Sequence, residues 1–310
     1  MPKKILSAVI SLFLALAFAE ASLAATISDL RPVFKPYRDS NKKLKIAIRS
    51  FKEDGRARLI SIDPEIFTTE IVDEGAIIST DVKIKDWKGT RFVEALYRYT
   101  APAKGIENQG MRSAEENTGG LFLTIDLCPS TKGFDRPAFE ATESLATPAP
   151  IAIAVSGLWI ERHRDEFDWI RKEEAEGRIK VTWMNHSYSH PYDKLKELKE
   201  NFLLTPGVGF EDEVLRNEKL LLENGITPSV FFRFPGLISD AALLEKLRKL
   251  SLIPIGADAW LAKGETPHNG AFILVHGNGN EEDGIERLLG FYGENKELKL
   301  LPLKEAFGHK

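Results

Sequence analysis

The 310-residue sequence predicts an α/β protein, a distorted barrel of parallel strands preceded by a small β-rich N-terminal region. Three observations support this. From residue 121 onward, short apolar runs alternate with helical stretches, which is typical of β/α units in a parallel sheet. Before residue 101, runs such as Lys43–Arg49 alternate with period two, as half-buried strands do. Polar side chains also follow successive predicted strands, where active residues of β/α barrels lie.

The N-terminus has the features of an export signal. Two lysines precede an apolar run at 5–19, and small residues then offer cleavage after Ala21 or Ala24. The run is shorter than the roughly 20 residues of a membrane span, although a short uncleaved anchor is the alternative. We expect residues 1–24 to be a signal peptide. The mature protein is then expected in the periplasm or outside the cell, with no membrane span.

Residues 25–118 are expected to form a β-rich N-terminal region followed by a linker. Strands are predicted at 43–49, 76–84 and 92–99 from their β-branched and aromatic residues. The polar, glycine-containing stretch 101–120 is the expected linker. This region contains no histidine, and it offers no recognisable chemistry.

Residues 119–310 are expected to form the barrel domain. Its predicted strands lie at 121–126, 151–155, 179–185, 230–234, 252–255 and 271–275. Its predicted helices lie at 136–145, 158–175, 210–224, 240–250 and 282–292. Gly225 and Asp240 have the residue types that end and begin helices.

Composition excludes several classes of protein. The chain is 43% hydrophobic with a formal net charge of -4, and it has no basic block, so no nucleic-acid partner is expected. Cys128 is the only cysteine, which excludes a disulfide within the chain. The ordinary explanation of a lone cysteine is a small buried apolar residue.

His186 and His190 stand four residues apart, directly after the predicted strand 179–185. On a helix or tight turn, two imidazoles at this spacing reach one metal ion. Two hydrogen-bonded structural histidines explain the pair equally well when it is taken alone.

Other polar or aromatic residues follow successive predicted strands. They are Asp126, Arg233, Asp258, Trp260 and His276. Each has an ordinary explanation as a turn, cap, ion-pair or core residue. Their occurrence together at the same end of successive strands favours an active site.

These residues carry a resemblance to the polysaccharide deacetylases (carbohydrate esterase family 4, the NodB-homology fold). The five stretches that resemble the family's motifs, in the family's order, are Leu123–Ser130, His186–Pro191, Arg233–Gly236, Asp258–Trp260 and Leu274–His276. The resemblance covers residues 121 to 306, and the fourth motif matches more loosely than the others.

The resemblance implies a NodB-like barrel that removes acetyl groups from N- or O-acetylated glycans. It also implies a divalent metal cofactor, for which zinc is the first choice. The implied partner is an acetylated polysaccharide such as peptidoglycan, a chitin-like polymer or an exopolysaccharide. The implied roles are Asp126 as base, His276 as acid, Arg233 orienting the base, Asp258 holding the tautomer of His276, and His186 and His190 as metal ligands. Trp260, Pro235 and Gly236 are expected to line the substrate pocket.

The sequence departs from the family where the metal is bound. Leu127 occupies the position of a metal-binding carboxylate, and Cys128 stands where the family has glycine. A thiolate is a good zinc ligand, so Cys128 is a candidate replacement. Gly236 stands where the family has an aromatic residue. Two alternatives therefore stay open: a glycan-binding protein without turnover, and a glycosidase using Asp126 and Asp258.

Overall fold

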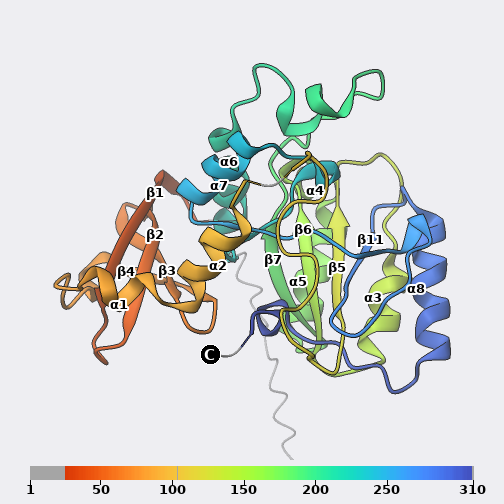
Figure 1. Ribbon diagram of the computed structural model, residues 1–310, viewed down its shortest axis with the longest axis horizontal. Helices are drawn as coiled ribbons and strands as arrows, with labels where there is room; N and C mark the ends of the chain where they lie inside the picture. Colours follow the sequence, from red (N-terminus) through yellow and green to blue (C-terminus); the bar gives the residue numbers. More distant parts are fainter. Residues whose placement is uncertain (1–24, 103, 309–310) are drawn as a thin grey trace, which may run out of the picture.

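The computed structural model describes residues 25–102 and 104–308, so the expected signal peptide lies outside the described residues. Two sheets form the framework, a four-stranded antiparallel sheet at the N-terminal end and a seven-stranded parallel sheet (Figure 1). The predicted distorted barrel of parallel strands with a β-rich region before it is confirmed. In the described ranges, no helix has the length and apolar character needed to cross a membrane.

The N-terminal sheet has its strands in sequence order. They are β1 (Ile27–Arg38), β2 (Leu44–Glu53), β3 (Arg56–Asp63) and β4 (Thr68–Asp73). Asp54 and Gly55 join β2 to β3 with φ of 49° and 78°, the positive values that a tight two-residue hairpin requires.

The strands predicted at 76–84 and 92–99 are wrong. The chain instead forms a 3₁₀ turn η1 (Glu74–Ala76), helix α1 (Ile84–Lys88) and helix α2 (Arg91–Tyr99). The buried residues of α2 are Phe92, Val93, Ala95 and Leu96. This spacing is that of one helix face, so the helical period outweighs the strand propensity of the aromatic residues.

The parallel sheet has the order β10-β11-β5-β6-β7-β8-β9. Its strands are β5 (Phe122–Leu127), β6 (Ala149–Val155), β7 (Ile179–Asn185), β8 (Phe231–Phe232), β9 (Ile253–Pro254), β10 (Ala259–Trp260) and β11 (Phe272–His276). Every residue of β5 and β6 is buried, as in strands that are covered on both faces. The sheet is open between β9 and β10.

Helices cover the outer face of the parallel sheet, where α3 and α8 lie side by side (Figure 1). The helices are α3 (Arg136–Glu143), α4 (Gly157–Arg162), α5 (Arg164–Ala175), α6 (Phe210–Glu223), α7 (Ala241–Lys249) and α8 (Glu282–Glu294). Short 3₁₀ turns are η2 (Leu198–Glu200), η3 (Phe202–Leu204), η4 (Pro235–Leu237), η5 (Leu261–Lys263) and η6 (Leu303–Ala306). The single helix predicted at 158–175 is divided at His163, whose ψ of 52° is not helical. Asp240 caps α7 as predicted, because its carboxylate accepts from the amide of Leu243 at 2.8 Å.

The stretch expected to be a linker, 101–120, is built into the barrel. Met111 bridges to Ile255 beside β9, and Ser113 bridges to Ala271 beside β11. The Asn108 side chain exchanges two hydrogen bonds with the backbone of Ala257, at 2.6 and 3.0 Å. This stretch therefore runs across the opening of the sheet. It is attached to the barrel by backbone bridges and hydrogen bonds and is not a free linker.

The N-terminal region and the barrel share a hydrophobic core and a buried ion pair. Phe92 and Ile46 pack in one cluster with Phe122 and Met184 of the barrel. Arg49 of β2 and Glu218 of α6 are buried and form two hydrogen bonds of 2.6 and 2.8 Å.

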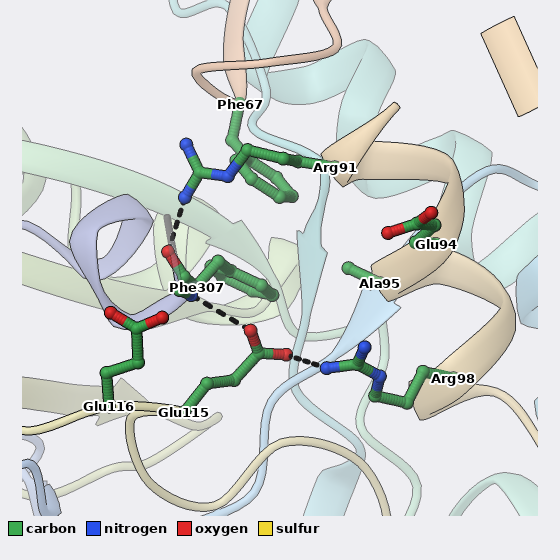
Figure 2. A pocket seen from close by; sticks show the side chains of 9 residues that line it. Phe67, Arg91, Glu94, Ala95, Arg98, Glu115, Glu116 and Phe307 are labelled. Atoms are coloured by element: carbon green, nitrogen blue, oxygen red, sulfur yellow. Dashed lines mark hydrogen bonds and ion pairs between the residues drawn. The ribbon is translucent and has the colours of Figure 1, made fainter. Parts of the chain in front are cut away.

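A small cavity of about 230 Å³ lies at the same joint, between α2 and the C-terminal segment (Figure 2). Glu115 accepts from Arg98 at 2.5 Å and from the amide of Gly308 at 2.9 Å. Arg91 donates to the carbonyl of Phe307. These bonds attach the C-terminal segment to α2, so the cavity belongs to the joint between the two regions.

Candidate active site

Parallel pairing brings the predicted site residues to one end of the sheet. His276, the last residue of β11, pairs in register with Asp126 of β5. His186 follows β7 directly, and Arg233 follows β8, where its amide donates to the carbonyl of Asn185 at 2.9 Å. The long segment between β7 and α6 rises above this end of the strands (Figure 1).

Asp126 is a buried carboxylate held by one arginine. Its Oδ1 accepts from Nη1 of Arg233 at 3.1 Å, and both side chains are almost fully buried. The same guanidinium donates to Oγ1 of Thr124 at 3.0 Å and to the carbonyl of Gly256 at 3.1 Å. Arg233 is thus fixed on three sides, and it holds Asp126 in one orientation.

His186, His190 and Cys128 form a compact cluster. Nε2 of His186 lies 3.4 Å from Sγ of Cys128 and 3.7 Å from Oδ2 of Asp126. Nδ1 of His186 donates to the carbonyl of Arg233 at 2.8 Å, which leaves Nε2 unprotonated and able to ligate a metal ion. The His190 ring lies 4.8 Å from the His186 ring, centroid to centroid.

This cluster fits a divalent metal ion. One donor atom from each of Cys128, His186 and His190 lies within 4.8 Å of the others. Thiolate and imidazole are the commonest zinc ligands, and three protein ligands leave a position open for water or substrate. Leu127 is fully buried in the core behind β5 and offers no donor atom.

The loop that carries the two histidines is not helical. Ser187 and His190 have φ of 62° and 45°, values that are strained for residues other than glycine. Glu213 of α6 stabilises the loop by accepting from the amides of Tyr188 and Ser189 at 3.0 and 2.7 Å. Its other oxygen accepts from the Ser189 hydroxyl at 2.7 Å. Glu213 could not be identified from the sequence, because it lies in α6, far along the chain from the loop, and no local pattern links the two.

His276 is held by a carboxylate that the sequence did not identify. Its Nδ1 donates to Oε2 of Glu281 at 2.8 Å, and the same oxygen accepts from Nε1 of Trp260 at 2.9 Å. The rings of Trp260 and His276 lie 5.7 Å apart. Glu281 immediately precedes helix α8, where an acidic residue is ordinary, so only the structure reveals its role.

The expectation that Asp258 holds His276 is wrong. Oδ2 of Asp258 lies 2.9 Å from Nε2 of His268, and Oδ1 accepts from the amide of Phe272. Asp258 therefore stabilises the approach to β11 through His268 and Phe272. A glycosidase that pairs Asp126 with Asp258 needs both carboxylates at the substrate, and neither of them lines the cavity beside His190 and His276.

A cavity of about 640 Å³ opens beside these groups. Its lining includes Cys128, His190, His276, Trp260 and Gly236. Pro235 is buried and does not line it, so the pocket prediction fits Trp260 and Gly236 only. Gly236 has φ of 61°, and a Cβ there would lie 2.3 Å from the ring of Phe202. The position where the family has an aromatic residue thus has no room here for any side chain.

Burial and neighbouring charges shift the pKa values at the site. Burial lowers the pKa of His186 to about 4, so its ring is neutral at pH 7. Burial opposes the Cys128 thiolate, yet His190 and His276 lower the pKa of this thiol to about 7. Burial likewise opposes a charged His276, but Cys128 and Glu281 raise the pKa of that ring well above its ordinary value.

Comparison with known proteins gives one family match and several structural similarities. Residues 28–91 match the family described as RP012 protein N-terminal domain. The chain is similar to a family 4 carbohydrate esterase from Bacillus anthracis, with a TM-score of 0.49 and 17% identity, covering 70% of this chain and 92% of that one. It is also similar to the chitin deacetylase from Colletotrichum lindemuthianum, with a TM-score of 0.45 and 19% identity over 64% and 92% of the two chains. For a CE4 family pseudoenzyme from Bacillus anthracis the TM-score is 0.44, with 13% identity over 88% and 89%.

Proposed function

We propose that this protein is an exported, metal-dependent carbohydrate deacetylase that hydrolyses acetyl groups on a polysaccharide. One observation carries the proposal. An arginine-held carboxylate and a glutamate-held histidine adjoin a cluster of metal-type side chains at one end of the sheet. Base, acid and metal ligands are the parts that hydrolysis of an acetyl amide or ester requires.

Asp126 acts as the base in this reaction. Arg233 occupies Oδ1, which leaves Oδ2 on the side of His186 to accept the proton of a water molecule. A divalent ion held by His186 and His190 supplies, when bound, the polarisation of the acetyl carbonyl and of that water. The buried setting of Asp126 and Arg233 keeps the carboxylate in one orientation between turnovers.

His276 acts as the acid. The bond from its Nδ1 to Glu281 fixes the ring and leaves Nε2 available to the substrate in the cavity that His276 lines. The raised pKa of His276 keeps the ring protonated at neutral pH, so that it can donate a proton to the leaving amine or alkoxide.

The cavity suits a sugar polymer. It combines polar groups with the aromatic rings of Trp260, Tyr192 and Phe202, and Tyr192 is 64% exposed at its edge. Apolar surfaces with a few directed polar groups are typical of ligand sites. The proposed substrates are peptidoglycan, chitin-like polymers and acetylated exopolysaccharides, reached after export directed by residues 1–24.

Acetate release from a panel of these glycans tests the function. We expect activity with zinc-loaded protein and losses of about 10²- to 10⁴-fold in kcat for Asp126→Asn and His276→Gln, the usual contribution of a general base or acid. His268→Gln is the matched control, because His268 lies outside the cavity lining and is 62% exposed. Equal losses in His276→Gln and His268→Gln would contradict the assignment of the acid.

Glycan binding without turnover is the second candidate, favoured by the absence of a donor atom at Leu127. It predicts that the zinc-loaded protein binds a glycan of the panel but releases no acetate from any of them. Calorimetry with the same glycans separates the two functions, since a substrate of the enzyme would be consumed during the titration.

A further inference from the structure

Alternation along β5 places Cys128 on the same side as the proposed base. Side chains of a strand point to opposite faces in turn. Leu123, Ile125 and Leu127 pack in the core against the outer helices, whereas Phe122 packs in the core shared with the N-terminal region. Asp126 and Cys128 continue the series of Phe122, and Cys128 lines the cavity. The side chain of Cys128 thus reaches the site, whereas the side chain of Leu127 is buried in the core on the opposite face of β5.

The distances around Cys128 match those of a metal site. Two tetrahedral zinc ligands, a sulfur at about 2.3 Å and a nitrogen at 2.0–2.1 Å, lie about 3.5 Å apart. Sγ of Cys128 and Nε2 of His186 are 3.4 Å apart. The His186 ring is already oriented by the Arg233 carbonyl at 2.8 Å, as ligating histidines usually are by an outer partner. The donor atoms of all three side chains lie within 4.8 Å of one another, so only small movements are needed.

We propose that the Cys128 thiolate is the third protein ligand of a zinc site completed by His186 and His190, replacing the carboxylate that Leu127 does not supply. A thiolate is a soft donor, so this site selects zinc or cobalt over magnesium and manganese, which prefer oxygen ligands. The use of this ion in deacetylation rests on the proposed function, whereas binding at Cys128 is tested without any substrate.

Cobalt provides a direct test on the unmodified protein. Chelator-treated mature protein is loaded with Co²⁺, and the near-ultraviolet charge-transfer absorption of a sulfur–cobalt bond is recorded. Because Cys128 is the only cysteine, such a band identifies this residue. We expect the band in the wild-type protein, its loss on addition of zinc, and no effect of a large excess of Mg²⁺. Absence of the band would overturn the proposal without reliance on any variant.

Variants then measure the contribution of the thiol. Cys128→Ser keeps the size of the side chain, and we expect it to weaken zinc binding by more than the roughly 10- to 100-fold typical of residues outside the ligand set. Unchanged zinc affinity in Cys128→Ser would overturn the proposal.

The outcomes for site and function are distinguishable. A sulfur–cobalt band together with no acetate release from any glycan would support the metal site and contradict the deacetylase function. Acetate release by a metal-loaded protein that shows no such band would support the deacetylase function and contradict the role of Cys128 as a metal ligand.

Discussion

One oxygen atom of Glu281 positions two side chains of the site. It accepts from Nδ1 of His276 and from Nε1 of Trp260, so the orientation of the acid and that of one cavity wall depend on each other. A histidine held in this way presents one tautomer to the substrate, a role that the resemblance had given to Asp258. Here Glu281 is a positioning residue, acting through His276.

Glu281→Gln is expected to change the pH dependence of acetate release. A carboxylate beside an imidazolium raises its pKa, so removal of the charge lowers the pKa of His276. The acid works only while protonated, and activity falls as pH rises through this pKa. The alkaline limb of the kcat profile should therefore move to lower pH.

Asp258→Asn is the matched control for that profile. Asp258 contacts His268 and the Phe272 amide, so its substitution should leave the alkaline limb in place. A shift in Asp258→Asn with none in Glu281→Gln would restore the role that the sequence suggested and contradict the one described above.

At the scale of elements, the loop between β7 and α6 is strained and externally supported. Positive φ at Ser187 and His190 costs on the order of 1–3 kcal/mol for each residue. Three hydrogen bonds to Glu213 and one from the Ser187 amide to Asn185 at 2.9 Å offset this cost. The spacing of the two imidazoles is thus maintained by α6, not by a local helical turn.

Glu213→Gln is expected to lower zinc affinity about 10- to 100-fold, as loss of an outer partner of a metal site does. Glutamine keeps one acceptor oxygen but cannot accept from both the amides and the Ser189 hydroxyl. Competition with a chromophoric chelator measures the affinity. Glu211→Gln, an exposed position on the same helix, should match the wild-type protein. Equal affinity in Glu213→Gln would mean that the loop holds its shape unaided.

At the scale of the whole molecule, the N-terminal region and the barrel share a core, so we expect them to unfold together. The inner face of the parallel sheet packs against residues of the N-terminal region, and the Arg49–Glu218 pair is buried between the two. Removal of either charge leaves the other without a partner in a dry environment.

Glu218→Ala is therefore expected to lower the free energy of unfolding by about 3–5 kcal/mol, measured by urea denaturation. Replacement of both partners, Arg49→Met with Glu218→Leu, should recover most of this loss. Lys219→Ala, which breaks an exposed pair with Glu223, should cost only about 0.3–0.5 kcal/mol. Two separate unfolding transitions in the wild-type protein would contradict the expectation that the two regions unfold together.

The sequence predicted those strands whose pattern of apolar residues matches the positions that are buried in the structure. β6 is a continuous apolar run, and β5 and β7 are mostly apolar. The polar residues that follow strands meet at one end, as parallel pairing requires. α2 was mistaken for a strand because its aromatic residues have high strand propensity. Glu281 and Glu213 were missed because their partners are brought to them by tertiary packing, which leaves no local pattern.

The stretch that crosses the opening between β9 and β10 also has a consequence for the edges of the sheet. Met111 and Ser113 attach the chain on both sides of the gap, and Gly110 packs so closely on Pro254 that a Cβ would lie 2.2 Å from its carbonyl oxygen. The stretch thus spans the gap between the two edges of the open sheet. The two edges of the sheet, which do not pair with each other, are therefore joined through backbone bridges to a segment that is itself not a strand.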